Sequence, residues 1–425
     1  MGAVVGARSV RGGGKAGSPS AVRERLEAFA GEVLAEAMNR PVQLVNGGLY
    51  LRGLLEQGPR KSLEPMVARL GADADYQSVQ QFVADSPWDP ALVVRAVGER
   101  VAPEIGVEAW VLDDTGFPKD GKDSPGVKRQ YSGTLGKTGN CQIGVSVHAV
   151  GKNGTVPLGW ALYLPEDWCE GTERRRRAKI PDEVSFKTKS ELGVELVESA
   201  SGWNVPGAPV LGDHAYGGNT WLRDRLDEAG CEYVLCVGPD TKVFEQGTSF
   251  EVPPRKTKGG AAPTRLRPDR KPNPIGKVIG RLGEHSAQTV TFRDGPDGEP
   301  HTSRFIFARV HAGHQWRADQ VKWREGAEVP PRAEWLIAEW PEGEDEPTDY
   351  WLSNLPASTE PERLARLARM RWKMELDYKQ LKGELGLDHY EGRSWLGWHH
   401  HTALVTAAHG FLTLERLHPF RPRPG

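Results

Sequence analysis

The chain has 425 residues, with 55 Lys+Arg against 57 Asp+Glu and a formal net charge of −2. At about 100 to 200 residues per domain, this length predicts two or three domains. The charge balance excludes a uniformly basic surface, so a polyanion site must come from segregated charge. Four Cys without paired spacing exclude a disulfide framework and a zinc ribbon. Because no apolar window approaches the roughly 18 residues of a membrane helix, we expect a cytoplasmic protein with no membrane partner.

The first quarter of the chain predicts helices. Residues 1–20 are rich in Gly, Ser and Arg and are expected to be disordered. Over 21–104, apolar residues recur at helical spacing. Helices are predicted at 22–40, 62–70, 77–86 and 90–102. We interpret 21–104 as a small helical domain in which no helix carries a motif that would name base-reading residues.

The middle of the chain consists of short runs rich in β-branched and aromatic residues, which predict strands. Strands are predicted at 106–114, 141–150, 155–164, 208–213 and 232–238. Helical patterns at 186–200 and 219–230 lie between the later strands. The order strand–strand–strand–helix–strand–helix–strand indicates an α/β (mixed α+β) fold with a mixed sheet covered by helices.

The second half of the chain begins with a loose segment rich in Pro, Gly and charge. We interpret 238–330 as an inserted, partly β subdomain between two parts of the α/β domain, 105–237 and 331–400. A C-terminal helix and a basic tail are expected over 401–425. Strands are predicted at 285–294, 303–310, 333–340 and 348–355, and one long helix from 361 to Gly386, which suits a C-cap.

Carboxylates stand at the ends of two predicted strands. Asp113 and Asp114 end the apolar run in WVLDDTG, and Asp213 ends the apolar run in VLGDHAYG. In an open α/β sheet, sites form outside the carboxyl ends of strands, so these side chains can converge. The commoner use of one such Asp is a turn or a helix cap.

A third carboxylate, Glu375, lies within the predicted long helix. At about 100° per residue, Arg371, Glu375 and Lys382 share one helix face, beside an apolar stripe that includes Met374 and Leu381, while Asp377 faces elsewhere. Such a face is suited to reaching a metal ion and a phosphate together. The alternative is an ordinary Arg–Glu surface pair.

The string RWKMELDYKQLK, in which three residues separate Arg371 from Glu375 and six separate Glu375 from Lys382, resembles the end of the Y-R-E-K signature of insertion-sequence DDE transposases. The signature's Tyr would fall at Ala368, so its role is absent or belongs to another aromatic. Further blocks resemble the insertion sequence 701 family. They are DDTGFPKDGKDSPGVKRQYSGTLGKTGNCQIGVSV, LYLPEDW, GDHAYG and KGELGLDHYEGRSWLGWHHH.

The resemblance implies an RNase H-like catalytic domain in which Asp113, Asp213 and Glu375 hold two Mg²⁺ ions, with Mn²⁺ able to substitute. Two such ions clamp the attacking and leaving oxygens of an in-line phosphodiester displacement. Arg371 and Lys382 would bind phosphate. The implied protein is a DNA transposase that cleaves at the ends of an insertion sequence and joins the 3′ ends to target DNA. Its partners would be terminal inverted repeats, target DNA and a second copy in a homodimeric synaptic complex.

Asp113 and Asp114 are expected to have different roles. Successive strand residues point to opposite faces, so only one of the two can face the metal ions. Related transposases place the metal-binding Asp two residues before a Thr or Ser, and Thr115 makes that residue Asp113. Asp114 would then cap the following turn or bind Lys119 or Lys122.

Basic residues are clustered. The run Arg174, Arg175, Arg176 and Arg177 is predicted to contact DNA backbone. Residues 253–281 carry nine Lys/Arg against one Asp, with solvated linker as the alternative. Tyr350 and Trp351 are candidates for stacking on a flipped base. The remaining candidate DNA contacts are Lys128, Arg129, Trp372 and Lys379.

Other chemistries fit less well. GTLGKTG lacks the first Gly of a P-loop, because Tyr131 occupies its place, so no ATP is expected. His311, His314 and the run 399–401 are expected to be surface or phosphate-facing residues. Two alternatives stay open: a domesticated or inactive transposase-derived DNA-binding protein, and a two-carboxylate glycoside hydrolase, which would leave the basic runs unexplained.

Overall fold

The computed structural model describes residues 19–133, 136–254, 264, 266–295, 299–313 and 330–418. Three predicted features lie wholly or largely outside these residues: the disordered N-terminus, part of the basic segment 253–281, and the basic tail from residue 419. His314 also lies outside them. Within the described part of the chain, no helix is long and apolar enough to cross a membrane.

Five α-helices form the first hundred residues, where the pattern predicts four. They are α1 (Pro19–Leu34), α2 (Pro41–Leu55), α3 (Leu63–Leu70), α4 (Tyr76–Ala84) and α5 (Pro90–Ile105). The pattern does not predict α2, because Gly47 and Gly48 give it low helix propensity. Gly47 has a packing role there. A Cβ at this position would lie 2.7 Å from the Leu34 side chain, so the glycine lets α2 approach α1 closely.

The middle of the chain forms the predicted strands and helices in the predicted order. These elements are β1 (Val107–Pro118), β3 (Lys137–Gly151), β4 (Thr155–Leu162), α8 (Lys189–Ser201), β5 (Val210–Gly212), α10 (Thr220–Glu228) and β6 (Tyr233–Cys236). Four short elements are additional: β2 (Lys128–Ser132), α6 (Glu166–Glu170), α7 (Thr172–Arg177) and α9 (His214–Gly217). β1 is antiparallel to β3 and parallel to β5, and β5 is parallel to β6. The predicted mixed sheet is therefore confirmed.

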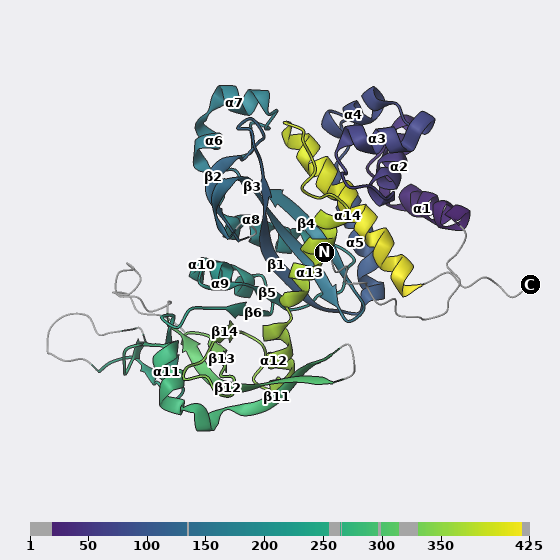
Figure 1. Cartoon of the computed structure of the whole chain (residues 1–425). Helices are drawn as coiled ribbons and strands as arrows, with labels where there is room; N and C mark the ends of the chain where they lie inside the picture. The colour runs from purple at the N-terminus through teal and green to yellow at the C-terminus, as the bar shows by residue number, and fades with distance from the viewer. Residues whose placement is uncertain are drawn as a thin grey trace, which may run out of the picture.

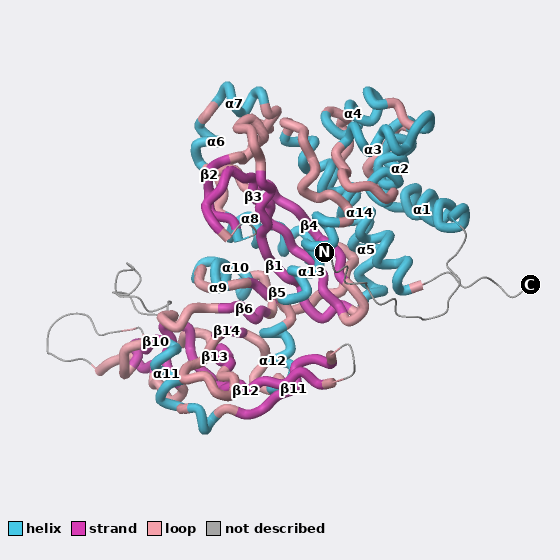
Figure 2. Tube along the Cα trace, viewed as in Figure 1, coloured by secondary structure: helices cyan, strands magenta, loops and turns pink. Residues whose placement is uncertain are grey.

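The segment 238–330 adds strands to this same sheet. Its elements are β7 (Lys242–Glu245), β8 (Phe250–Glu251), β9 (Arg267–Pro268), β10 (Asn273–Pro274), α11 (Ile275–Leu282), β11 (Gln288–Asp294) and β12 (Pro300–Ala312), followed by β13 (Ala333–Glu339) and β14 (Asp349–Ser353). Twelve of the described strands form one sheet in the order β10-β7-β12-β13-β14-β6-β5-β1-β3-β2, with β11 on β12 and β4 on β3, while β8 and β9 pair in a separate two-stranded sheet. Figure 2 shows the strands continuing from the upper to the lower half of the molecule.

The single long helix predicted from 361 to 386 is wrong, because the chain forms two helices there, α12 (Pro361–Arg369) and α13 (Trp372–Gly383). Between residues 370 and 374 the backbone hydrogen bonds span three residues instead of four, which tightens the turn and changes the helix direction. Gly386 has a φ of 68° but lies beyond the end of α13. The break lets α12 pack beside β11 and β13 while α13 runs toward β1 (Figure 1).

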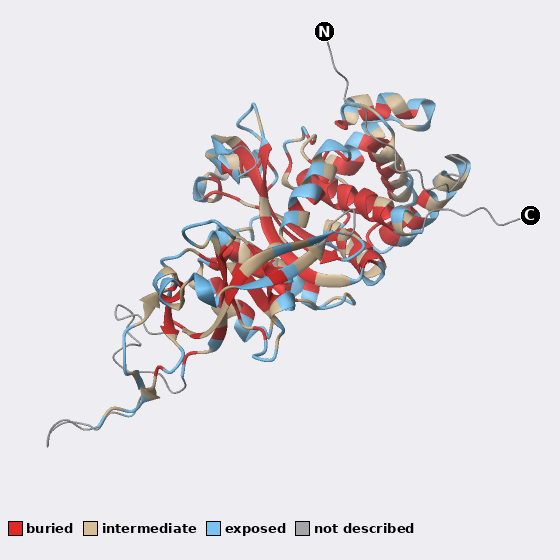
Figure 3. Cartoon of the chain, turned by 60° about the horizontal axis from the view of Figure 1, so that its bottom comes forward, coloured by how far each residue is buried: buried red, intermediate tan, exposed pale blue. Residues whose placement is uncertain are grey.

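The last helix, α14 (Trp395–Leu417), starts six residues before its predicted first residue and is buried along most of its length (Figure 3). It lies between the N-terminal helices and β4. Side chains of α1, α2, α5, β1, β3, β4 and α14 share one hydrophobic cluster. The helices over 21–104 are thus packed on the central sheet, and the predicted domain boundaries remain predictions.

Candidate active site

Two aspartates occupy equivalent positions on neighbouring strands of the sheet. β1 and β5 run parallel, and Leu112 pairs with Gly212, so Asp113 and Asp213 come next on each strand. The Asp213 carboxylate also caps α9, because its Oδ1 accepts hydrogen bonds from the backbone N–H of Ala215 and Tyr216 at 2.9 and 3.3 Å. The register of the sheet therefore brings the two carboxylates to one region, where the parallel pairing of β1 with β5 ends although β1 itself continues to Pro118.

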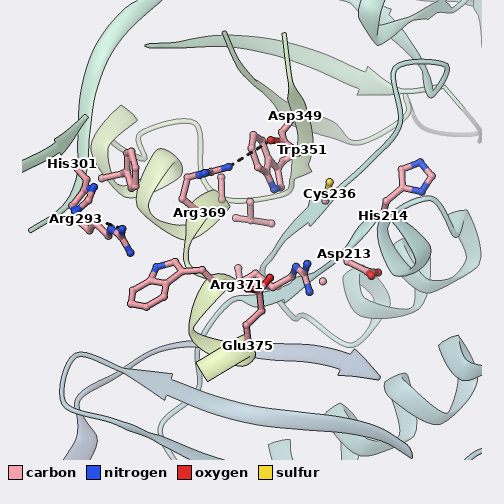
Figure 4. A pocket seen from close by; sticks show the side chains of 16 residues that line it. Asp213, His214, Cys236, Arg293, His301, Asp349, Trp351, Arg369, Arg371 and Glu375 are labelled. Atoms are coloured by element: carbon pink, nitrogen blue, oxygen red, sulfur yellow. Dashed lines mark hydrogen bonds and ion pairs between the residues drawn. The ribbon is translucent and has the colours of Figure 1, made fainter. Parts of the chain in front are cut away.

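Arg371, the residue that caps the start of α13, lies among three carboxylates. Its Nη1 is 3.0 Å from Asp113 Oδ2. Burial would lower the pKa of Arg371, but the negative charges of Asp113, Asp213 and Glu375 together raise it. Figure 4 shows the guanidinium between Asp213 and Glu375. The predicted Asp, Asp and Glu set is thus grouped around one cation.

The Asp113 carboxylate is 9% exposed, and its environment disfavours the charged form. Burial is the main cause that raises the pKa of Asp113 to about 7. The charge of Arg371 lowers this pKa, and the charges of Asp213 and Asp114 raise it. Its Oδ1 also accepts a hydrogen bond from the Asp114 N–H at 2.9 Å. Near neutral pH, the charge of this group therefore depends on a nearby cation.

Asp213, Arg371 and Glu375 line one pocket, with a volume of about 590 Å³. Glu375 lies in the first turn of α13 and is exposed. The side chains of Trp351, from β14, and Arg293, from β11, also line the pocket (Figure 4). A pocket of this size, lined by carboxylates and arginines, can hold a charged substrate group.

The pattern did not predict that the inserted segment reaches this site. Arg293 on β11 lies over the Trp372 ring, with 4.5 Å between the guanidinium carbon and the ring centroid. His301, on β12, is 3.5 Å from an Arg293 nitrogen. Arg293 and His301 face each other across the β11–β12 hairpin, whereas the contact between Arg293 and Trp372 joins residues far apart in the sequence, and no local motif around Arg293 signals it.

Comparison with known proteins decides the family. A sequence profile described as "DDE superfamily endonuclease" matches residues 33–299, more than half of the chain. The chain belongs to the DDE superfamily of endonucleases. Its mixed α/β catalytic fold is RNase H-like, as predicted. The matched range includes Asp113 and Asp213 and ends before Glu375.

The DDE endonuclease is also similar to the "Probable transposase for insertion sequence element IS701" of Microchaete diplosiphon. The two are 29% identical over 189 residues, which are 44% of this chain and 46% of that protein. The chain thus matches about half the length of this curated relative.

Asp114 points away from Asp113, as strand alternation requires. Its Oδ2 accepts a hydrogen bond from Lys189 Nζ, on α8, at 2.9 Å and lies 3.4 Å from the Tyr216 hydroxyl. The prediction that Asp114 binds Lys119 or Lys122 is wrong. Lys119 instead donates to the carbonyl oxygen of Tyr390, because β1 continues past Asp114 to Pro118 and carries Lys119 away.

Lys382 contacts β1 and does not line the pocket of the DDE endonuclease. Its Nζ donates to the Gly116 carbonyl oxygen at 2.7 Å. Burial lowers the pKa of Lys382 to about 8, while the charges of Asp388 and Cys141 raise it. The predicted phosphate contact by Lys382 therefore needs a rotamer other than the one in this structure.

The basic run on α7 divides into two pairs. Arg174 stacks on Trp168 at 3.6 Å and donates to the Lys122 carbonyl oxygen at 2.8 Å, and Arg175 donates to the Pro181 carbonyl oxygen at 2.6 Å. Arg176 and Arg177 are 78% and 76% exposed and pair with Glu173 of the same helix. Only the second pair has the free surface that DNA contact requires.

The remaining predicted DNA contacts have mixed positions. Trp372 and Lys379 lie on the exposed face of α13, and Arg129 is exposed, while Lys128 is 2.9 Å from Asp167. Trp351 lines the pocket at 5% exposure. Tyr350 belongs to a different hydrophobic cluster, since neighbouring strand residues alternate between faces, so this placement gives it no access to a base in the pocket.

The prediction that the histidine run 399–401 faces the surface or phosphate is wrong for His400 and His401, whereas His399 is half-buried. His400 and His401 are 0% and 1% exposed within α14. The ring nitrogens of His400 lie 2.9 Å from the carbonyl oxygens of Val83 and Trp88, and those of His401 lie 2.9 Å from the Tyr50 hydroxyl and 3.0 Å from the Gly386 carbonyl oxygen. These side chains join α14 to the N-terminal helices.

Enzymes of the DDE superfamily use divalent metal ions, and the donor set fits such an ion in its chemistry. Carboxylate oxygens are the ligands that Mg²⁺ and Mn²⁺ prefer, and Asp113 already has a cation, Arg371, at contact distance. Among the residues that the structure describes, no three His, Cys, Asp or Glu side chains lie close enough together to hold a metal ion. To share a metal ion, the three carboxylates would have to lie closer together than they do in this structure.

Proposed function

We propose that the chain is a DNA transposase that cleaves at the ends of an insertion sequence and joins the 3′ ends to target DNA. The observation that carries this proposal is that Asp213, Glu375 and Arg371 line one pocket, while Arg371 also pairs with the buried Asp113. The family membership supports nuclease chemistry, and the name of the similar transposase supports the substrate class.

In this proposal the three carboxylates hold two Mg²⁺ ions, for which Mn²⁺ can substitute. Bound ions supply the positive charge that lowers the barrier to in-line displacement at a phosphodiester. Arg371 leaves Asp113 and binds a phosphate oxygen pair, which its planar guanidinium suits. Arg293 and Arg369, which line the same pocket, add positive charge toward the DNA.

We further propose that DNA lies along the exposed face of α13. That face carries Trp372, Glu375, Leu376 and Lys379 at helical spacing, with Trp372 37% and Leu376 55% exposed. Aromatic and basic side chains next to a carboxylate suit a strand whose phosphate enters the pocket. The helices over 21–104 would recognise the terminal inverted repeats, and two copies would act together on paired ends.

The experiment is to incubate the protein and Mg²⁺ with labelled DNA that carries a candidate element end. The proposal expects a cut at the end and joining of the 3′ strand to target DNA, both abolished in Asp213→Asn. Specific binding without any cut in Mg²⁺ or Mn²⁺ would contradict the enzyme and favour a domesticated DNA-binding protein. The variant Asp345→Asn, at an exposed residue outside the lining of the pocket, serves as the matched control.

A further inference from the structure

The buried stripe of α13 contains a carboxylate. Met374, Asp377 and Leu381, spaced by three and four residues, are 0%, 4% and 0% exposed, so Asp377 is on the stripe between two apolar residues. The prediction that Asp377 faces away from this stripe is wrong. An ionised carboxylate in such a position is costly unless hydrogen bonds satisfy it.

Three donors from three different elements satisfy this carboxylate. Asp377 Oδ2 lies 2.5 Å from His148 Nδ1, on β3. Oδ1 lies 2.8 Å from His409 Nε2, on α14, and accepts from the Thr155 hydroxyl, on β4, at 2.6 Å. Burial would raise the pKa of Asp377, but the charge of His409 and the bond to His148 lower it below its usual range.

Each histidine serves the carboxylate alone. The other ring nitrogens, His148 Nε2 and His409 Nδ1, are buried and have no hydrogen-bond partner in the described part of the chain. Both rings are almost fully buried, at 0% and 1% exposure. A buried ring nitrogen without a hydrogen-bond partner calls for an explanation. Here each ring makes its one hydrogen bond to Asp377, which points to a role in holding that carboxylate.

Further directional bonds follow the same side of α13. The Tyr378 hydroxyl lies 2.8 Å from the Ser146 hydroxyl, and Ser146 pairs with Asp113 across β3 and β1. Lys373 Nζ donates to the Gly151 carbonyl oxygen at 2.7 Å. Apolar packing alone is non-directional, whereas these bonds fix how far α13 is rotated about its axis.

Rotation of α13 decides where Glu375 points. Glu375 precedes Asp377 by two residues, which places the two carboxylates about 200° apart around the helix. When Asp377 points into the core, Glu375 necessarily points outward, where it lines the pocket with Asp213. A change of rotation would move Glu375 away from the other carboxylates.

We propose that Asp377, His148 and His409 form a positioning cluster that fixes the rotation of α13 and thereby presents Glu375 to the metal ions. This inference rests on the proposed function. It predicts that loss of either histidine donor weakens metal binding, although the cluster itself lies outside the pocket. None of the three is a catalytic residue.

Matched substitutions separate positioning from general stability. The Asn amide nitrogen takes the place of imidazole Nδ1, and the Gln amide nitrogen takes the place of Nε2, so His148→Asn and His409→Gln keep the donor. His148→Leu and His409→Leu remove it. Tyr233→Phe is the stability control, because it removes a buried hydrogen bond to Glu334, 2.5 Å long, away from α13.

The measurement is Mn²⁺ uptake by the full chain without DNA, followed by the loss of the electron paramagnetic resonance signal of free Mn²⁺. We expect the two Leu variants to bind Mn²⁺ about tenfold more weakly or worse, as for other residues that orient ligands, and the Asn and Gln variants to recover most of the affinity. Tyr233→Phe should lower the melting temperature and leave Mn²⁺ affinity unchanged. Unchanged affinity in both Leu variants would overturn the proposal.

Hydrogen exchange of residues 372–383 gives a second readout that needs no metal. We expect faster exchange in His148→Leu than in His148→Asn, and no change in Tyr233→Phe. If the wild type takes up no Mn²⁺, or if Asp213→Asn does not reduce the uptake, the proposed function fails. In that case hydrogen exchange alone tests the positioning proposal. Equal exchange in His148→Leu and His148→Asn would then overturn it.

Discussion

The guanidinium of Arg371 and the carboxylate of Asp113 lie 3.0 Å apart, joining the start of α13 to the middle of β1. Asp113 is nearly buried, and burial raises its pKa to about 7. Because this value already includes the lowering by Arg371, Asp113 would be protonated at neutral pH without the ion pair. The pair also sets the place at which the other two carboxylates, Asp213 and Glu375, gather.

This ion pair predicts non-additive stability effects. Asp113→Asn, Arg371→Met and the double variant should give a coupling energy of about 1 to 3 kcal/mol at pH 8, because Arg371→Met leaves the buried Asp113 without its cation, whereas Asp113→Asn leaves Arg371 near Asp213 and Glu375. Urea unfolding of the four proteins measures it. Additive losses would show that the two side chains do not interact in solution.

Asp113 and Asp114 should behave differently. Asp113→Asn is expected to abolish Mg²⁺-dependent cleavage and to leave DNA binding intact or tighter, because less negative charge faces the phosphates. Asp114→Asn should still cut and should lose about 1 kcal/mol of stability through its bond to Lys189.

The control for this pair is Lys189→Met, which breaks the same bond from the other side and should match Asp114→Asn in its melting temperature. If Asp114→Asn is inactive with an unchanged melting temperature while Asp113→Asn still cuts, the two roles must be exchanged.

The run on α7 should separate DNA binding from folding. Arg176→Ala together with Arg177→Ala should weaken binding to all DNA sequences about equally and reduce the slope of log affinity against log salt by about 1 to 2. The melting temperature should not change, since both side chains are exposed. Arg174→Ala should instead lower it by removing the contact with Trp168. A loss confined to element ends would mean that this run reads bases.

Local patterns were sufficient for the central sheet but not for the contacts across it. β1, β3, β4, β5 and β6 follow from runs of β-branched and aromatic residues, and Asp113 and Asp213 follow from the ends of those runs. Arg293 reaches Trp372 only because β11 folds beside α12, and no local pattern encodes that approach.

Two errors near the site have different causes. No Pro or Gly in the sequence signals the break before α13, which comes from a tightened turn at Met370 and Arg371. The burial of Asp377 could have been found, because its spacing from Met374 and Leu381 is that of a buried stripe. A charged residue on such a stripe indicates a buried partner, and here His148 and His409 come from distant segments.

The buried histidines of α14 predict acid sensitivity. Burial lowers the pKa of His401 to about 4, below the usual value near 6.5. Between these values the unfolded chain binds more protons than the folded chain, so the free energy of unfolding falls as pH falls through this window, by about 3 kcal/mol for this residue. His401→Gln should flatten that dependence, and His418→Gln, at an exposed residue, should not. Equal slopes in all three proteins would contradict the burial of His401.

The central claim is that Asp113, Asp213 and Glu375 share bound metal. Fe²⁺ in place of Mg²⁺, with ascorbate and peroxide, generates radicals that cut the backbone beside the bound ion, and mass spectrometry locates the cuts. The account predicts three groups of cuts, near residue 113, near residue 213 and near residue 375, all lost in Asp213→Asn. Cuts that avoid these three segments, or that persist unchanged in Asp213→Asn, would contradict it.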